Sequence, residues 1–300
     1  MRSIRAAFLA LALGACTMPS TPSSGPASIG PPSAPTAAPS PAPAQSPEPP
    51  GPAPFSAARA MDHVRKLAGD IGPRAAPSKA YRRAARYVRG ELREMGYRVT
   101  MEAVPLPGGR TWNVSARWPG ATGRPVLLGA HLDTVEGSPG ANDNASGVAV
   151  ILEVARSVAG TALGEEIRFV AVGGEEVQPG GGHHYGSLYD AARSRPRAMV
   201  SVDMIGLDRD IIVAWLGTGS RRTVKLLLRS AREIGIEARE RVLPDVSDHG
   251  PYERAGVPSG FLWTGDEPNH HEPTDVVTNV RRGALARMGR LLLRFLSRNA

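Results

Sequence analysis

Short runs of continuous apolar residues, separated by stretches with the spacing of amphipathic helices, constrain the fold of this chain most strongly. Each run has the length and composition of a β-strand that is buried on both faces; the runs are Pro125–Ala130, Ile167–Val172, Met199–Val202, Ile211–Leu216 and Pro258–Trp263. Apolar residues recur at helical spacing from Val148 to Ala155, from Val224 to Ala231 and from Leu285 to Phe295. Strands that alternate with helices predict an α/β fold, a three-layer sandwich around a mainly parallel mixed sheet.

The part of the chain that precedes these runs adds two helices and a β-hairpin. The spacing is helical over residues 55–69 and 78–96, and Pro73 and Pro77 separate the two segments. Residues 97–104 and 111–118 then alternate between apolar and polar, as the two strands of a hairpin do. We therefore expect a single domain that covers residues 55–300.

Residues of the types that commonly bind metal ions follow the apolar runs. His131 ends the first run, and the Gly/Asn/Asp-rich loop after it carries Asp133 and Asp143. Glu175 and Glu176 follow the second run, and Asp203 follows the third. His270 and His271 lie just past the last run. In open α/β sheets, ligands bind beyond the carboxyl ends of the strands. The sequence therefore predicts a metal site at one edge of the sheet.

Imidazole and carboxylate ligands without thiolates favour zinc in a catalytic site. A pair of ions needs a bridging carboxylate with further ligands on each side. In this arrangement His131 and Asp203 bind one Zn²⁺, Glu176 and His271 bind the other, and Asp143 bridges them. Glu175 is then free to act as a general base. Cobalt and manganese accept the same ligands.

These residues lie in motifs that resemble the co-catalytic di-zinc aminopeptidases of clan MH, which include secreted bacterial leucyl-type aminopeptidases. The resemblance covers residues 55–300 and rests on the order of six motifs: His131 with Asp133, the loop around Asp143, the pair Glu175 and Glu176, Asp203, the triplet Ser247, Asp248 and His249, and the segment from His271 to Asp275. It implies a phosphorylase/hydrolase-like fold and removal of N-terminal residues from peptides with a free amino terminus. It also implies that Asp133 holds His131 and that the peptide bond after Asp143 is cis.

The chain departs from these relatives at two places beside the site. A longer loop, which includes the Gly-rich run 180–182, His183 and His184, follows the two glutamates; we expect both histidines in the rim of the site rather than among the ligands. His270 stands where some relatives have a tyrosine that stabilises the oxyanion, so either His270 or another residue takes that role. His271 is the preferred ligand of the pair because of its spacing to Asp275.

The first residues predict export and a lipid anchor. Arg2 and Arg5 precede a short apolar run, and small residues then precede Cys16, the single cysteine. Residues 1–15 therefore read as a lipoprotein signal peptide, with Cys16 as the lipidated residue, and an ordinary secretory signal is the alternative. Residues 16–54 contain about half of the 28 prolines and almost no charge, which predicts a disordered Pro/Ala/Ser-rich linker.

The formal charge of +8 does not indicate nucleic-acid binding, because the basic residues are scattered and no aromatic-rich basic stripe accompanies them. Ser146 lacks the surroundings of a serine nucleophile and is expected to cap a helix. Two other readings remain open. One is another activity of clan MH, such as a carboxypeptidase or glutaminyl cyclase, and the other is an envelope protein that binds metal or peptide without catalysis.

Overall fold

The computed structural model describes residues 51–177 and 184–299, together with Gly30. The predicted signal peptide, Cys16, most of the predicted linker and His183 lie outside the described residues. The folded unit begins slightly before the expected boundary at Phe55. The Ala53 N–H donates to the Ser157 carbonyl at 2.7 Å, and the Phe55 ring packs where a side chain on Gly289 would lie.

The described residues form one mixed sheet in the order β1-β2-β4-β3-β5-β8-β6-β7. The central strands β4, β3, β5 and β8 are parallel, whereas β2 pairs antiparallel with β4, and β6 pairs antiparallel with β8. The strand bounds are Arg98–Leu106 (β1), Gly109–Arg117 (β2), Val126–His131 (β3), Ile167–Val172 (β4), Ala198–Val202 (β5), Ile211–Trp215 (β6), Ala238–Val242 (β7) and Ser259–Trp263 (β8). The carboxyl ends of β4, β3, β5 and β8 therefore meet at one edge.

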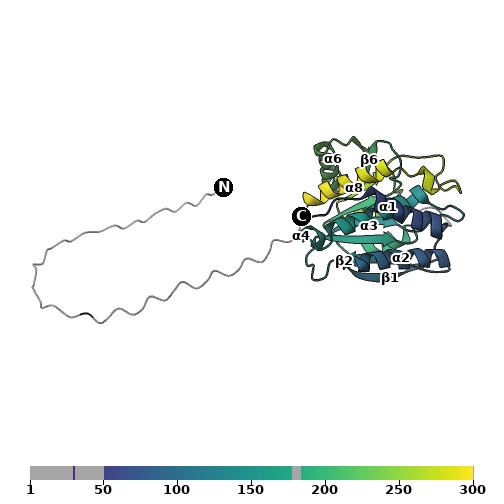
Figure 1. Cartoon of the computed structure of the whole chain (residues 1–300), viewed down its shortest axis with the longest axis horizontal. Helices are drawn as coiled ribbons and strands as arrows, with labels where there is room; N and C mark the ends of the chain where they lie inside the picture. The colour runs from purple at the N-terminus through teal and green to yellow at the C-terminus, as the bar shows by residue number, and fades with distance from the viewer. Residues whose placement is uncertain (1–29, 31–50, 178–183, 300) are drawn as a thin grey trace, which may run out of the picture. The chain divides into compact units, whose positions relative to one another are not determined.

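Helices cover both faces of the sheet (Figure 1). The helices α1, α2, α3, α6 and α8 contact one another in one layer, and α5 contacts α7 in the other. Their bounds are Ala57–Val64 (α1), Arg65–Ile71 (η1), Lys79–Glu94 (α2), Ala141–Ser146 (η2), Gly147–Val158 (α3), Ala162–Glu165 (α4), Tyr185–Ala191 (α5), Arg222–Glu233 (α6), His249–Arg254 (α7), Val277–Asn279 (η3) and Arg282–Ser297 (α8). This is the three-layer α/β sandwich expected from the sequence.

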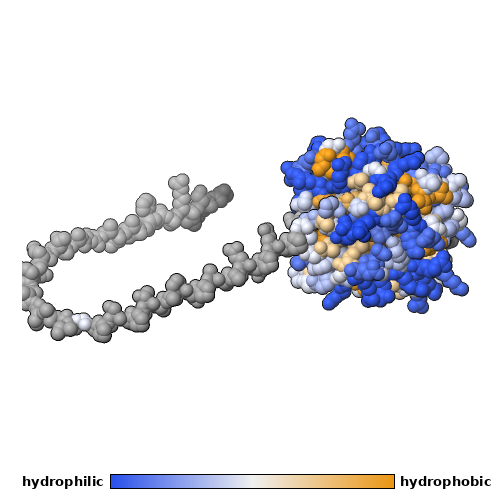
Figure 2. Space-filling model, in the orientation of Figure 1, coloured by the Kyte–Doolittle hydropathy of each residue, from blue (hydrophilic) through white to orange (hydrophobic). Residues whose placement is uncertain are grey.

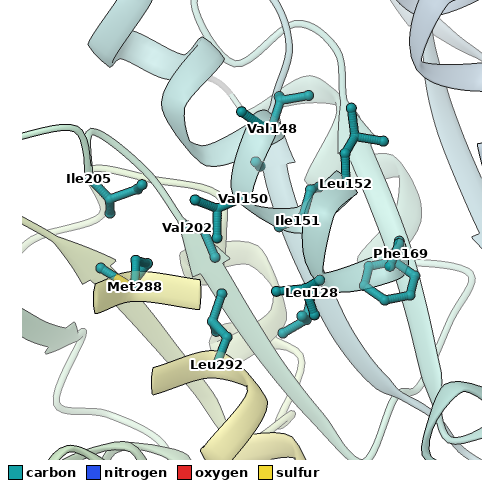
Figure 3. Packing of buried hydrophobic residues seen from close by; sticks show 14 of the residues in the cluster. Leu128, Val148, Val150, Ile151, Leu152, Phe169, Val202, Ile205, Met288 and Leu292 are labelled. Carbon is teal, nitrogen blue, oxygen red and sulfur yellow. The ribbon is translucent and has the colours of Figure 1, made fainter. Parts of the chain in front are cut away.

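Alternate residues of the central strands supply two separate cores. Leu128 and Phe169 belong to the larger core, which also contains Val148 and Leu152 of α3 and Leu292 of α8 (Figure 3). Their neighbours Leu127, Val170 and Met199 face the opposite side and pack with Tyr252 of α7. Because both faces of these strands are covered, their sequences are continuous apolar runs. Burying each large apolar side chain contributes about 1.5–3 kcal/mol.

Strand β7 and helix α7 are among the elements absent from the sequence prediction, for different reasons. Strand β7 lies at the edge of the sheet and is largely exposed, so its sequence lacks the apolar alternation that identifies a strand. Helix α7 has only six residues, too few for a helical repeat of apolar residues to show. It also begins within the triplet Ser247, Asp248 and His249, which the resemblance assigns to a family motif.

The face of the domain drawn in Figure 2 is mostly hydrophilic, as expected when the apolar residues pack inside. Within the described ranges, no helix combines the length and apolar character that a bilayer span requires.

Candidate metal centre

The predicted ligands lie together at the carboxyl edge of the parallel strands. His131 is the last residue of β3 and pairs with Val172, the last residue of β4, while Asp203 directly follows β5. Glu175, Glu176, His270 and His271 reach the same place from the loops after β4 and β8. They line a cavity of about 530 Å³ whose other walls include Leu243, Asp245, Phe261, Trp263 and Asp266.

Asp143 lies at the centre of the cluster, with its two oxygens facing different partners. Its Oδ1 is 3.1 Å from His131 Nε2, and that same nitrogen is 3.2 Å from Asp203 Oδ1. Its Oδ2 is 3.4 Å from His271 Nε2, which is 3.0 Å from Glu176 Oε1. The carboxylate predicted as the bridge thus has one histidine–carboxylate pair on each side. These are the pairs that the sequence assigns to the two ions.

His270 competes with His271 for the same oxygen. Its Nε2 is also 3.4 Å from Asp143 Oδ2, and the two imidazole rings have centroids 3.8 Å apart. His271 contacts both Asp143 and Glu176, whereas His270 contacts Asp143. The geometry therefore favours His271 as a ligand, because it is the histidine that also contacts Glu176, while the two side chains are similarly exposed, at 38% for His270 and 41% for His271.

Asp133 lies beside the cluster and contacts His131 through its main chain. The ring nitrogen Nδ1 of His131 is 3.1 Å from the main-chain carbonyl of Asp133, so the residue holds this histidine, as the resemblance implies, but not with its carboxylate. The Asp133 carboxylate accepts the N–H groups of Gly174, Glu175 and Glu176 at 2.9–3.2 Å. The side chain of Asp133 therefore fixes the turn that presents both glutamates.

Two residues that the sequence prediction did not assign to the site hold the loop that carries Asp143. Asp275 accepts the N–H groups of Asn142 and Asp143 at 2.8 and 2.9 Å. Arg74 is fully buried and donates to the carbonyls of Leu132, Pro139 and Gly140 at 2.7, 2.5 and 3.0 Å. The sequence separation of about 60 residues explains why no local pattern reveals Arg74. Asp275, by contrast, was already visible as the last residue of a motif.

The triplet Ser247, Asp248 and His249 contributes through its serine. Ser247 Oγ donates to Asp203 Oδ2 at 3.0 Å, so it orients the carboxylate whose other oxygen faces His131. Groups that orient ligands in this way tune metal affinity.

The peptide bond between Asp143 and Asn144 is cis, as the resemblance implies. Ser146 occupies the N-cap position of α3, as the sequence predicts, but its side chain makes no capping hydrogen bond. Its hydroxyl donates to the Asn142 carbonyl at 2.7 Å and accepts the Ile205 N–H at 3.1 Å. The side chain of Asn144 instead accepts the first N–H of the helix, that of Gly147.

The charges in the cavity fit bound cations. Burial, together with the charges of Asp143 and Glu175, raises the pKa of Glu176 to about 11. Burial also raises the pKa of Asp203, whereas hydrogen bonds from His131 and His270 hold the pKa of Asp143 well below its usual range despite burial. Such a concentration of buried carboxylates costs free energy unless positive charge compensates it. Nitrogen and oxygen donors without sulfur are also those of catalytic zinc sites.

Glu175 points into the same cavity but contacts a residue that was expected in the rim. Its Oε1 is 3.0 Å from Nδ1 of His184, and the His184 side chain is only 2% exposed. His184 follows the glycine-rich run 180–182 in the sequence, and for this reason the sequence predicts a place in the rim of the site. His184 is in fact buried beside the candidate general base.

Comparison with known families agrees with this arrangement. The sequence model of peptidase family M28 matches residues 113–296, a range that contains every predicted ligand. The chain belongs to this family.

Relatives of the chain have names that describe activities, as two of them illustrate. The chain is 34% identical over 179 residues to "Aminopeptidase YwaD" of Bacillus subtilis, which covers 56% of this chain and 39% of the relative. It is 31% identical over 231 residues to "Leupeptin-inactivating enzyme 1" of Streptomyces exfoliatus, which covers 72% of this chain and 51% of the relative. The chain thus spans about half the length of these relatives or less.

Solved structures share the fold at low sequence identity. A zinc aminopeptidase from Bacillus subtilis superposes with a TM-score of 0.73 over 82% of this chain and 96% of that chain, at 18% identity. The glutaminyl cyclase of Tannerella forsythia superposes with a TM-score of 0.69 over 81% of this chain and 98% of that chain, at 23% identity. The fold is therefore common to peptidases and cyclases, and the activity must be argued from the site.

Proposed function

We propose that this M28 protein is a zinc-dependent aminopeptidase that removes N-terminal residues from peptides. The observation that carries the proposal is the position of Asp143 between two histidine–carboxylate pairs, with Glu175 in the same cavity. That arrangement suits two ions joined by a carboxylate, with a base beside them.

The residues of the chain have separate tasks in the proposed reaction. His131, Asp203, Glu176, His271 and the bridging Asp143 would hold the ions, which when bound acidify water and polarise a carbonyl group. Glu175 takes a proton from the attacking water while the water oxygen bonds to the scissile carbonyl carbon. Glu175 then gives this proton to the amine nitrogen as the C–N bond breaks.

His270 is the candidate donor to the carbonyl oxygen as negative charge develops there. Its ring lines the cavity next to His271, where some clan MH relatives have a tyrosine. A positioned donor of this kind stabilises the tetrahedral intermediate.

The charge of the cavity supports recognition of a free amine rather than a free carboxylate. Among the described residues that line it, carboxylates come from Asp143, Glu175, Glu176, Asp203, Asp245 and Asp266, and none of the lining residues is Lys or Arg. A carboxypeptidase commonly uses an arginine fork for the terminal carboxylate of its substrate, and His184 in this cavity already faces the carboxylates of Glu175 and Asp245. The acidic lining instead favours the ammonium group of an N-terminus.

A glutaminyl cyclase is the second candidate, because structures with that name share the fold. Cyclases of this type use one zinc, whereas both oxygens of Asp143 face ligand pairs here. The geometry therefore favours the two-metal peptidase.

We also propose that the enzyme acts at the cell envelope. Support comes from the basic and apolar first residues, the small residues before Cys16 and the proline-rich stretch that follows. Residues 16–54 would then tether the domain to a lipid anchor at Cys16.

The proposed activity is tested with one peptide in two forms, with a free and with an acetylated amino terminus, each with and without chelator. We expect trimming of the free form alone, abolished by the chelator and restored by zinc. Release of C-terminal residues would indicate a carboxypeptidase, and conversion of an N-terminal glutamine to a ring without trimming would indicate a cyclase. No reaction by protein that contains zinc would favour a binding protein.

A further inference from the structure

The start of α5 is fixed to the end of β4 in a way that brings Glu175 and His184 together. The Tyr185 N–H donates to the carbonyl of Gly174 at 2.9 Å. Because Glu175 follows Gly174 and His184 precedes Tyr185, this bond places the two side chains next to each other.

Asn113 of β2 ties the same two segments a second time. Its Oδ1 accepts the Gly173 N–H at 3.1 Å, and its Nδ2 donates to the Gly186 carbonyl at 2.8 Å. Gly186 packs so closely that an added Cβ would lie 2.5 Å from the Gly173 carbonyl oxygen. These contacts therefore fix where the main chain of His184 lies relative to Glu175.

The ring of His184 lies between two carboxylates. Its Nδ1 is 3.0 Å from Glu175 Oε1, and its Nε2 is 3.9 Å from Oδ1 of Asp245, which pairs with Arg254. Burial lowers the pKa of His184, but the adjacent carboxylate of Glu175 and the nearby acidic charges raise that pKa to about 9. The ring is therefore a cation at neutral pH, held next to one oxygen of Glu175.

A contact with one oxygen restricts rotation of the carboxylate. Oε1 of Glu175 is engaged by His184, so Oε2 is the oxygen available to a water molecule in the cavity. A general base must hold its accepting atom within hydrogen-bond reach of the proton that it removes, and groups that orient such side chains commonly change rates by about 10- to 100-fold.

We propose that His184 is a positioning residue that orients Glu175 for proton transfer. This inference rests on the proposed peptidase function. It assigns a task to the longer loop by which the chain departs from the clan MH pattern, because that loop ends at His184. His184 does not touch the substrate and acts through Glu175.

The test compares kcat and KM for a free-amino peptide in wild type, His184→Ala and His184→Gln. We expect His184→Ala to lower kcat by about 10- to 100-fold, with KM, zinc content and the unfolding temperature close to those of wild type. His184→Gln keeps a donor near Glu175 and should recover part of the lost rate. If the alanine variant fails to fold, His184→Leu, which fills similar space without a donor, provides the comparison and should show the same loss of kcat.

A double-variant comparison separates positioning from a general structural effect. In the Glu175→Gln background, His184→Ala should cause little further loss of rate, because the base on which it acts is already removed. His63→Gln is the matched control, since His63 is a buried histidine of α1 whose Nδ1 lies 2.5 Å from Tyr87 Oη and outside the cavity. That control should keep wild-type kcat.

Three outcomes would overturn the proposal. The first is a kcat for His184→Ala within two-fold of wild type. The second is a loss of rate in His184→Ala that is explained by a lower zinc content. The third is that His184→Ala lowers kcat by the same factor in the Glu175→Gln background as in wild type. The contact between His184 and Glu175 can also be tested without a peptide substrate by NMR of the full chain. The ¹⁵N chemical shifts of the His184 ring should change when Glu175 is replaced in Glu175→Gln. If wild type trims no peptide, the peptidase proposal fails, while an unchanged His184 signal would refute the contact itself.

Discussion

At the scale of single residues, the most important feature for the proposed reaction is that the adjacent carboxylates of Glu175 and Glu176 have different partners. They are neighbours in the turn that Asp133 holds by three N–H groups. Glu176 contacts His271, whereas Glu175 contacts His184. Adjacent carboxylates with such different partners can serve as a ligand and as a base.

Glu175→Gln tests the role of the base. The amide keeps the size of the side chain but cannot accept a proton, so kcat should fall by about 10²- to 10⁴-fold. Zinc content and the unfolding temperature should match those of wild type. Single-turnover kinetics together with metal analysis make this measurement, and a variant that turns over at nearly the wild-type rate would remove Glu175 from the mechanism.

Arg74 offers a second residue-scale test, this time of stability. Arg74→Met would leave the carbonyls of Leu132, Pro139 and Gly140 without their donor, which should lower the free energy of unfolding by about 3 kcal/mol or more. Arg74→Lys should recover only part, because an ammonium group lacks the fork of a guanidinium. Chemical denaturation with metal removed measures the change. Arg86→Met, an exposed arginine of α2, serves as the control and should change stability little.

At the scale of elements, helix α7 connects the site to the sheet. Ser247 precedes it and orients Asp203. His249 begins it and stacks on Phe261 of β8, with ring centroids 5.2 Å apart. The position of this short helix is therefore tied to the metal centre at its first turn.

His249 makes the stability of the fold depend on pH. Burial lowers its pKa from 6.5 to about 4, so below pH 6.5 the unfolded chain binds a proton that the folded chain does not. Stability from this residue is present above pH 6.5 and is lost as the pH falls towards 4, by about 2 kcal/mol at pH 5. His249→Phe should therefore lose less stability than wild type between pH 7.5 and 5.

Denaturation of both proteins in chelator, at the two pH values, measures that difference without release of metal. An identical loss in variant and wild type would contradict the assignment to His249. Other groups such as Asp248, whose pKa burial raises to about 7, act in both proteins and cancel in the comparison.

The sequence predicts the elements with strong periodicity and misses those that depend on context. Four parallel strands and their end residues were recognisable because both faces of these strands are buried. Strand β7 was not, since its exposed edge position permits charged residues such as Arg239 and Arg241.

The same limit applies to the site. The predicted ligands lie together, because a parallel sheet gathers its strand ends. Arg74 and His184 escaped prediction because their contacts depend on distant segments that meet only in the folded domain. For Asp133, the sequence indicates the position of a carboxylate but not which of several nearby N–H groups it accepts.

At the scale of the whole molecule, we propose separate tasks for the folded domain and the first residues. The domain carries every predicted ligand within residues matched by the M28 family. The proposed anchor depends on Cys16 alone. We expect Cys16→Ser to move the protein from the membrane fraction to the soluble fraction of the cell envelope, with kcat unchanged. Fractionation with an activity assay measures both, and an unchanged distribution would contradict lipidation at Cys16.

The most direct test of the account is a zinc titration of metal-free protein, with trimming of a free-amino peptide as the readout. The position of Asp143 between two ligand pairs predicts that the rate rises until two zinc ions are bound per chain. Asp143→Ala should prevent this rise. Full activity with one ion per chain, or zinc-loaded protein that leaves the peptide intact, would contradict the account.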